Sequence, residues 1–411
     1  MSQNIKNVAV IGAGAMGQGI ALSVALADLK VTLIDVKQEF IEKGINNIKR
    51  MLDSRIKRGQ LTENQVQTYL GSINGQTNYQ NLENTDFVIE AALEKIEVKL
   101  KIFQELDNII KPEAILASNT SALSISQIAC ATKRKDKVIG MHFFNPAHIM
   151  KLVEVIPGYH TSHQTIATTQ SLSSLLGKTA VVVKECPGFL VNRLLFPYMN
   201  EAIYALTEGL ASINQIDETA LQFGLPMGPF TLMDMTGLDI CLDVNEFLYN
   251  EYGLRFETAK LLKLMVEHGF LGQKSKAGFY LHDNQPNTPK QVNPDFIELL
   301  ASLKTGNKPC VKFDFNRVIL PMFNEAIYAY QEGVVELADI DIAMNYGCGL
   351  KRGILSLSTD NGLAWCLEQM GNYHKLYGER FRPSWLLKKM VHAGILNLTK
   401  NANSANLSLV K

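Results

Sequence analysis

The stretch Val8-Ala-Val-Ile-Gly-Ala-Gly-Ala-Met-Gly17 decides the fold, because it joins a short apolar run to a glycine-rich loop. A run of small residues follows as far as Ala27 and predicts a helix, and Val31-Thr-Leu-Ile-Asp35 then predicts a second strand. The pattern G-x-G-x-x-G between a strand and a helix is typical of a dinucleotide-binding βαβ unit. The start of the chain therefore predicts an α/β domain of the Rossmann type.

The residues of this loop suit a cofactor with a pyrophosphate. Gly12 allows the tight turn, Gly14 lets the phosphates approach the backbone, and Gly17 permits close packing of helix on strand. Met16 lies in the same loop, and Asp35 is placed to accept a hydrogen bond from a ribose 2′-hydroxyl. A carboxylate there repels the extra phosphate of NADP, so NAD is the predicted cofactor. The alternative is a glycine turn in another kind of α/β protein.

Composition narrows the classes of partner. The 411 residues include 40 basic and 40 acidic ones, so the net charge is +0 and no global field favours nucleic acid or an anionic membrane. The apolar run Val8 to Ala27 is interrupted by four glycines and Gln18, which argues against a signal peptide or a membrane span. Six widely spaced cysteines without a C-x-x-C pair predict no metal site, no disulfide framework and a cytoplasmic location.

Periodicity divides the chain into two parts. Up to about Lys184, short β-branched runs alternate with amphipathic stretches, which predicts a doubly wound α/β domain over residues 1–185. The predicted strands are Asn7-Ile11, Val31-Asp35, Asp86-Glu90, Ala114-Ser118, Val138-Phe143, Leu152-Ile156 and Thr179-Val183. From Pro187 onward the strands stop, and helical periodicity begins with Leu190 to Leu210.

The helical part contains an internal repeat. The segment Asn192-Arg-Leu-Leu-Phe-Pro-Tyr-Met-Asn-Glu-Ala-Ile-Tyr204 returns as Asn316-Arg-Val-Ile-Leu-Pro-Met-Phe-Asn-Glu-Ala-Ile-Tyr328. We therefore predict two tandem all-α domains, 186–283 and a degenerate copy at 309–411, joined by a Pro- and Asn-rich linker at 284–308. Copies packed about a pseudo-twofold axis would imitate a homodimer interface. The chain is expected to be a monomer with this internal pseudo-dimer, or a homodimer.

One segment has the residues of a general base. Gly140-Met-His142-Phe-Phe-Asn-Pro-Ala-His148 and the following apolar run to Ile156 predict two strands that fold back on each other, with His142 opposite Glu154. A carboxylate opposite an imidazole orients the ring, fixes its tautomer and stabilises the imidazolium, as the oxidation of an alcohol requires. A satisfied core histidine is the alternative, and His148, His160 and His163 compete for the role.

Two further segments are candidate binding sites. Leu116-Ala-Ser-Asn-Thr-Ser121 places polar residues after a strand, at the sheet edge where α/β proteins bind ligands. Ser121 or Ser124 capping the next helix is the structural alternative. The segment Lys37 to Arg58 has seven basic residues, Lys49 and Lys57 among them, against three acidic ones. It would suit the phosphates of a carrier such as coenzyme A, although a solvated helix face explains it too.

Taken together, these motifs resemble the 3-hydroxyacyl-CoA dehydrogenase family, with its 3-hydroxybutyryl-CoA dehydrogenase members. The resemblance covers nearly the whole chain and rests on VAVIGAGAMGQGIA, VIEAALE, SNTSAL, HFFNPAHIMKLVEV, PGFLVNR, GLPMGPF and GQKSKAGFY. It implies reversible, NAD-dependent oxidation of an (S)-3-hydroxyacyl-CoA to the 3-ketoacyl-CoA, in fatty-acid β-oxidation or butanoate metabolism.

The resemblance also implies roles for single residues. His142 is implied as the base, Glu154 as its partner, and Ser121 and Asn192 as groups that contact the substrate. Glu94 and Lys99 are implied to line the cofactor site, and the basic helix that carries Lys49 and Lys57 to lie along coenzyme A.

The second helical copy departs from the family pattern. It keeps Asn316-Arg317, but these follow Val311-Lys-Phe-Asp-Phe315, and the Gly228-Pro229-Phe230 element is missing. We therefore expect one active site per chain. Two other functions stay open: a β-hydroxyacid dehydrogenase acting on a small substrate without coenzyme A, and a non-catalytic structural protein like lens λ-crystallin.

Overall fold

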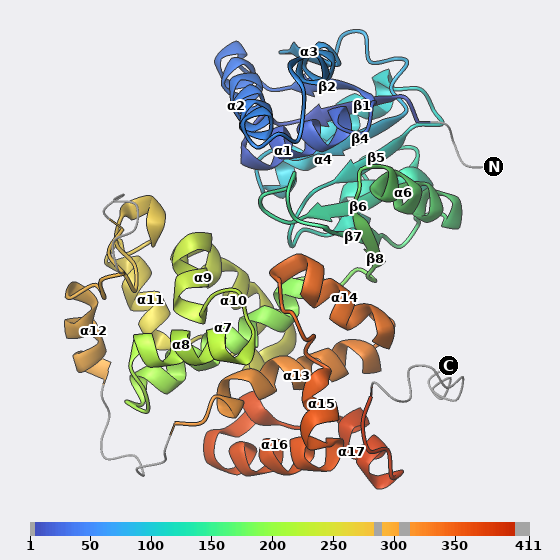
Figure 1. Cartoon of the computed structure of the whole chain (residues 1–411). Helices are drawn as coiled ribbons and strands as arrows, with labels where there is room; N and C mark the ends of the chain where they lie inside the picture. Colours follow the sequence, from blue (N-terminus) through green and yellow to red (C-terminus); the bar gives the residue numbers. More distant parts are fainter. Residues whose placement is uncertain (1–4, 283–289, 304–312, 399–411) are drawn as a thin grey trace. The chain divides into compact units, whose positions relative to one another are not determined.

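The computed structural model describes residues 5–282, 290–303 and 313–398 (Figure 1). The chain divides into two compact units, Met1–Phe189 and Leu190–Lys411. None of the helices in the described ranges has the length and apolar character needed to cross a membrane.

The first unit is built on an eight-stranded sheet in the order β3-β2-β1-β4-β5-β6-β7-β8. The strands are β1 (Asn7–Ile11), β2 (Lys30–Ile34), β3 (Ile73–Gln76), β4 (Phe87–Glu90), β5 (Ile115–Ser118), β6 (Val138–Phe143), β7 (Leu152–Pro157) and β8 (Thr179–Val182). All neighbours run parallel except β6 and β7. The strand order reverses between β1 and β4, which is where doubly wound sheets bind nucleotides. The predicted Rossmann-type domain is confirmed.

The seven predicted strands are present, and β3 is an eighth. Its sequence, Ile73-Asn-Gly-Gln76, has one apolar residue and none that is fully buried, because it forms the edge of the sheet. An edge strand lacks the β-branched, alternating pattern on which the prediction depended.

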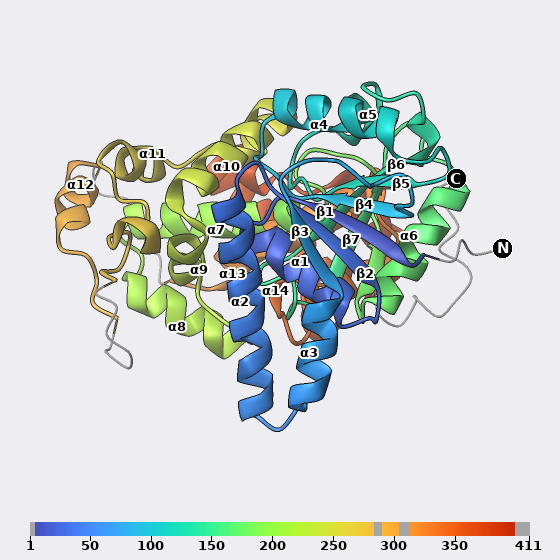
Figure 2. The same cartoon turned by 90° about the horizontal axis from the view of Figure 1, so that it is seen from above.

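Helices connect the strands of this unit. They are α1 (Ala15–Ala25), α2 (Gln38–Lys57), α3 (Glu63–Gly71), α4 (Ile96–Ile109), α5 (Ile125–Ala129), the 3-10 turn η1 (Lys135–Lys137) and α6 (His163–Leu175). Helix α2 buries Ile41, Ile48 and Leu52 and exposes Lys49 and Lys57, as its period predicts. Figure 2 shows α2 and α3 side by side as a helical hairpin.

The second unit is mainly helical. Its elements are α7 (Val191–Thr207), α8 (Ile213–Phe223), α9 (Pro229–Thr236), α10 (Leu238–Tyr252), η2 (Gly253–Phe256), α11 (Lys260–Glu267), η3 (Gln273–Ser275), α12 (Asp295–Leu303), α13 (Asn316–Gln331), α14 (Leu337–Cys348), α15 (Ser356–Asn361), α16 (Leu363–Tyr377), η4 (Gly378–Phe381) and α17 (Trp385–His392). Isolated β-bridges between residues 272 and 292 interrupt the predicted all-helical part. The predicted 284–308 linker contains α12, which contacts α11, while residues 284–289 and 304–308 lie outside the described residues.

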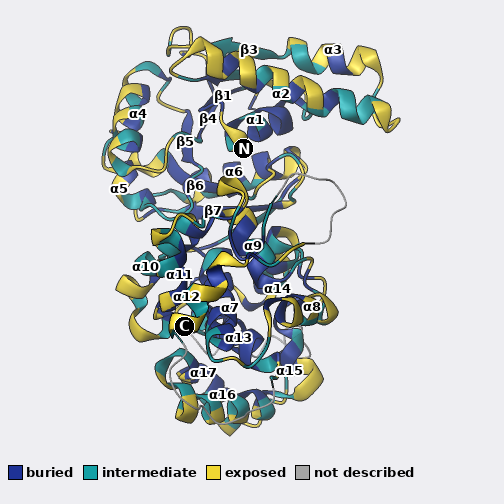
Figure 3. Cartoon of the chain, turned by 90° about the vertical axis from the view of Figure 1, so that its left-hand side faces the viewer, coloured by how far each residue is buried: buried dark blue, intermediate teal, exposed yellow. Residues whose placement is uncertain are grey.

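The elements from α13 onward follow the order of those from α7. Helices α7 and α13 begin the two series and contact each other extensively. In Figure 3 both helices are largely dark blue, because nearly all their residues are buried. The buried set includes the charged residues Arg193 and Glu201 in α7 and Arg317 and Glu325 in α13.

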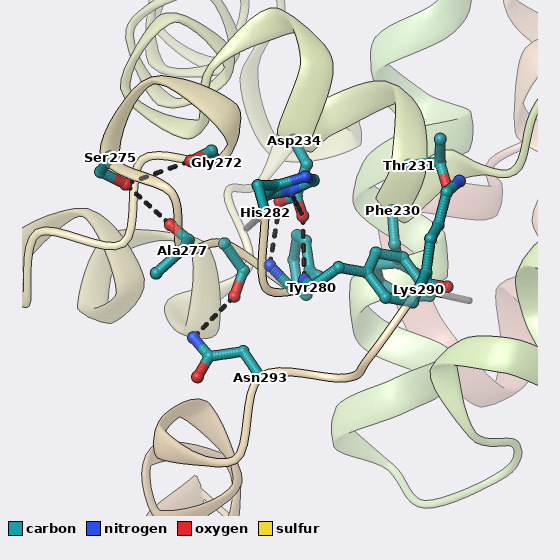
Figure 4. A network of polar contacts seen from close by, with 12 residues as sticks. Phe230, Thr231, Asp234, Gly272, Ser275, Ala277, Tyr280, His282, Lys290 and Asn293 are labelled. Carbon is teal, nitrogen blue, oxygen red and sulfur yellow. Dashed lines mark hydrogen bonds and ion pairs between the residues drawn. The ribbon is translucent and has the colours of Figure 1, made fainter. Parts of the chain in front are cut away.

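A buried aspartate explains the second glycine of the GQKSKAGFY motif. The carboxylate of Asp234, fully enclosed, accepts hydrogen bonds from the backbone N–H groups of Phe279 and Tyr280 and from His282 Nε2, each at 2.9 Å (Figure 4). Burial raises the pKa of Asp234, although these donors favour its charged form. A Cβ at Gly278 would lie 2.0 Å from Asp234 Oδ1. The motif therefore serves the fold of the first copy.

A close contact between a glycine and an aspartate occurs in both helical copies, although the sequence of the second copy lacks the Gly-Pro-Phe element. In the first copy, a Cβ at Gly228 would lie 2.2 Å from the carboxyl carbon of Asp217. In the second, a Cβ at Gly353 would lie 2.2 Å from the carboxyl carbon of Asp341. The Gly-Pro-Phe sequence is absent, but a glycine lies close against an aspartate in both copies, and that aspartate is buried in the first copy and half-buried in the second.

Candidate active site

His142 and Glu154 face each other across the antiparallel pair β6 and β7. The register aligns the two residues, and His142 Nδ1 lies 2.7 Å from Glu154 Oε2. Glu154 is 0% exposed and His142 is 7% exposed, so the contact between the carboxylate and the imidazole is shielded from water. A carboxylate only accepts hydrogen bonds, which places the proton on Nδ1 and leaves Nε2 basic. The predicted pairing of these two residues is confirmed.

Aromatic rings restrict the imidazole further. The ring centroid of Phe144 lies 4.6 Å from that of His142, and the ring of Phe189 lies 5.8 Å away. Such packing holds the ring in one orientation, which a base that must meet a substrate hydroxyl requires.

The three competing histidines lack this setting. His160 and His163 are exposed on the surface. His148 is half-buried, and its pKa is lowered by burial and then by the charges of Arg55 and Lys178. The geometry therefore favours His142 among the four.

A buried ion cluster lies at the carboxyl ends of β4 and β5. Lys99 Nζ, with 1% of its side chain exposed, lies 2.8 and 2.9 Å from the two oxygens of Glu90 and 3.2 Å from Glu94 Oε2. Ser118 Oγ donates to Glu90 at 2.6 Å. The family resemblance implied that Lys99 lines the cofactor site. In the structure Lys99 is enclosed, and it connects Glu90 to the exposed Glu94. Sequence reasoning missed Glu90, although a carboxylate that ends the apolar strand Phe87-Val-Ile-Glu90 is a usable signal.

Glu94 holds the polar loop that contains Ser121. Its Oε1 accepts hydrogen bonds from Thr120 Oγ1 at 2.6 Å and from the backbone N–H of Ser121 at 2.7 Å. Ser124 is the residue that caps α5, since its side chain accepts from the N–H of Gln127. The capping alternative therefore applies to Ser124, and Ser121 lies in the loop before it.

Asn119 connects this loop to the histidine strand. Its Oδ1 accepts a hydrogen bond from the backbone N–H of Phe143 at 2.8 Å. Phe143 follows His142 directly, so the ends of β5 and β6 are fixed next to each other. Asn119 belongs to the polar motif that ends at Ser121, but the sequence pattern alone assigns it no role.

The three glycines of the loop differ in whether the surrounding protein leaves room for a side chain. A Cβ at Gly12 would lie 2.5 Å from the oxygen of Ala91, and one at Gly17 would lie 1.7 Å from the oxygen of Gly12. At Gly14 a Cβ would meet nothing within 4 Å, and its φ of −68° suits any residue. The fold therefore requires Gly12 and Gly17, and the space at Gly14 is open to a cofactor.

Other features of the loop fit NAD. Helix α1 has no side-chain cap and no acidic residue in its first turn, which suits a phosphate at its N-terminus. Asp35 Oδ2 accepts from the backbone N–H of Ala13 at 2.7 Å, which joins the end of β2 to the loop. Met16, also predicted to contact the cofactor, is half-buried in the first turn of α1.

Three predicted residues belong to elements other than these strands and the loops that follow them. Lys49 and Lys57 are exposed on α2. Asn192 is the second residue of α7 and belongs to the second unit.

The doubly wound sheet, the glycine loop and the Asp35 carboxylate define an NAD-binding oxidoreductase. Known families agree: the NAD binding domain of 3-hydroxyacyl-CoA dehydrogenase matches residues 7–186, and the C-terminal domain of the same family matches twice, at 188–282 and 313–404. The chain belongs to the 3-hydroxyacyl-CoA dehydrogenase family and is an NAD-dependent dehydrogenase.

Solved structures extend the match. 3-Hydroxybutyryl-CoA dehydrogenase from Escherichia coli has a TM-score of 0.85 at 30% identity, covering 95% of this chain and 100% of that one. (S)-3-Hydroxybutyryl-CoA dehydrogenase from Ralstonia eutropha is 44% identical, with a TM-score of 0.67. That match covers 68% of this chain and 100% of the Ralstonia chain. The peroxisomal fatty acid beta-oxidation multifunctional protein of Arabidopsis thaliana is 34% identical over 96% of this chain. The chain spans 56% of that longer protein.

Proposed function

We propose that the chain interconverts short (S)-3-hydroxyacyl-CoA and 3-ketoacyl-CoA thioesters, with His142 as the general base. The observation that carries the proposal is the buried 2.7 Å contact between His142 and Glu154. The two similar bacterial structures are 3-hydroxybutyryl-CoA dehydrogenases, which supports a short-chain substrate. Fatty-acid β-oxidation or butanoate metabolism would use this reaction.

In the proposed mechanism, His142 and Glu154 transfer the proton, and the cofactor site serves the hydride transfer. Glu154 accepts the Nδ1 hydrogen of His142, so Nε2 takes the proton of the substrate hydroxyl while the buried carboxylate stabilises the imidazolium. Bound NAD would supply the acceptor for the hydride from the substrate carbon that bears this hydroxyl. Gly14 and Asp35 are proposed to hold its pyrophosphate and ribose.

Two polar residues are proposed to contact the substrate. Ser121 lies in the loop that Glu94 holds, and Asn192 is the second residue of α7. We propose that Glu94 lines the cofactor site and that Lys99, which is itself held by Glu90, keeps Glu94 in place.

The direct test is NADH oxidation followed by absorbance with acetoacetyl-CoA, longer 3-ketoacyl-CoAs and a small ketoacid. The proposal requires turnover of the thioesters with the highest kcat/KM for the short ones. Turnover of the ketoacid alone would favour a β-hydroxyacid dehydrogenase. If NAD binds but none of these compounds reacts, a structural protein is the better reading.

We expect the double substitution Lys49→Glu with Lys57→Glu to raise the KM for acetoacetyl-CoA by roughly tenfold at low salt. Both side chains are exposed on α2 and would meet the phosphates of coenzyme A. The KM for NADH should change little. Lys101→Glu with Lys135→Glu, at exposed positions elsewhere in the same unit, is the control with an equal charge change. Equal effects on both substrates would refute the assignment.

We further propose a cytoplasmic monomer with one active site. The cytoplasmic location is a prediction from the cysteine content, and the Arabidopsis relative is a peroxisomal protein. Sedimentation should give a species near 45.7 kDa if the two helical copies replace a homodimer. A species of twice that mass would show that the chain pairs through another surface.

A further inference from the structure

The second helical copy supplies the charges that neutralise a buried arginine of the first. Arg193 is completely enclosed in the first turn of α7. Its Nε lies 2.6 Å from Oε1 of Glu325, and its Nη1 lies 2.8 Å from Oε2 of Glu332. Glu325 belongs to α13, and Glu332 directly follows that helix. An enclosed guanidinium in the first copy thus depends on carboxylates of the second.

The same arrangement recurs with the copies exchanged. Arg317, in the first turn of α13, lies 2.6 Å from Glu201 and 2.7 Å from Glu208, both contributed by the first copy. Arg317 directly follows Asn316, as Arg193 directly follows Asn192. The two networks are pseudo-symmetric, but only one lies beside a residue of the proposed site.

A second arginine makes each network more rigid. Arg255 lies 3.1 Å from Glu325, and its guanidinium lies 4.6 Å from the ring centroids of Tyr252 and Tyr328. In the corresponding network around Arg317, Arg380 lies 2.9 Å from Glu201. Glu325 and Glu201 therefore each serve two arginines and are almost fully buried, at 3% and 2% exposed.

Asn192 and Arg193 are consecutive residues in the first turn of α7. The backbone of one helical turn has a fixed geometry, so neighbouring residues in it move together. The place at which Arg193 is held therefore helps to set the orientation of Asn192. In the second copy Asn316 has the corresponding position in the sequence repeat, and its amide donates to Asp314 Oδ1 at 2.9 Å.

We propose that Glu325 of the second helical copy is a positioning residue for the active site: by holding Arg193 it fixes the first turn of α7 and with it the side chain of Asn192. The inference rests on the proposed contact of Asn192 with substrate. It gives the second copy a role in catalysis in addition to packing.

The pseudo-symmetry provides a matched control within the chain. Glu325→Gln and Glu201→Gln each remove one buried charge that serves two arginines, so both should lower Tm to a similar extent. Only Glu325→Gln should lower kcat/KM for acetoacetyl-CoA, by between about tenfold and about 100-fold, because misplacing a contact group is costly. The KM for NADH should be unchanged in both. Equal activity losses in the two variants, or none in Glu325→Gln, would overturn the proposal.

A conservative pair keeps the test valid if the glutamine variants do not fold. Arg193→Lys and Arg317→Lys retain each positive charge but lose the forked geometry. Arg193→Lys should again lower kcat/KM for the thioester, and Arg317→Lys should not. The reverse order, or equal losses, would contradict the positioning role.

Asn192→Ala separates this inference from the function on which it rests. If Glu325 acts through Asn192, the double variant Asn192→Ala with Glu325→Gln should lose no more activity than Asn192→Ala alone. Additive losses would overturn the inference and leave the contact of Asn192 with substrate intact. An Asn192→Ala variant with normal kcat/KM would remove that contact from the proposed function.

Discussion

His142→Gln should lower the turnover of acetoacetyl-CoA by about 10²–10⁴-fold, which is the usual contribution of a general base. Glutamine can occupy the same place on β6 and meet Glu154, but it has no nitrogen that takes up a proton at neutral pH. The affinity for NADH should be unchanged, because the glycine loop follows β1 and Asp35 follows β2, whereas His142 lies on β6. Steady-state NADH absorbance gives the turnover, and a fluorescence titration gives the affinity.

The control for this variant is a histidine without a buried partner. His163→Gln alters an exposed residue at the start of α6 and should leave both measurements at their original values. If His142→Gln turns over at the original rate, His142 has no part in proton transfer. If instead the variant loses NADH affinity as well, the substitution has disturbed the sheet edge as a whole.

The pairing of His142 with Glu154 was predictable because both lie in one local hairpin. Two adjacent apolar runs fix the register, and side chains directly opposite on an antiparallel pair share a face. The glycine loop was predictable for a similar reason, since its strand, turn and helix are consecutive in sequence.

Contacts between distant segments were not predictable in this way. Glu90 and Ser118 meet because β4 and β5 are neighbours in a parallel sheet, and nothing local to either residue specifies that neighbour. The exchange of arginines between the helical copies has the same character. The repeat indicates a pseudo-twofold pair, but the crossing of α7 over α13 decides that Arg193 meets Glu325.

Gly14→Ala should abolish most NAD binding without unfolding the protein. The backbone at Gly14 has a φ that alanine adopts freely, and a Cβ there meets no atom within 4 Å. We expect the free energy of unfolding without NAD to change by less than about 1 kcal/mol, because a stiffer unfolded chain and a poorer N-cap oppose each other. The added methyl group would occupy the space for the pyrophosphate, so the Kd for NAD should rise at least about tenfold.

Gly17→Ala is the informative contrast, because a Cβ at that position would lie 1.7 Å from the oxygen of Gly12 and the loop itself must move. This variant should lose both stability and binding, as judged by thermal melting with and without NAD. A Gly14→Ala protein that binds NAD normally would show that the cofactor does not approach the backbone there. Loss of stability in Gly14→Ala comparable to that in Gly17→Ala would show that the fold itself, and not the cofactor, requires a glycine at both positions.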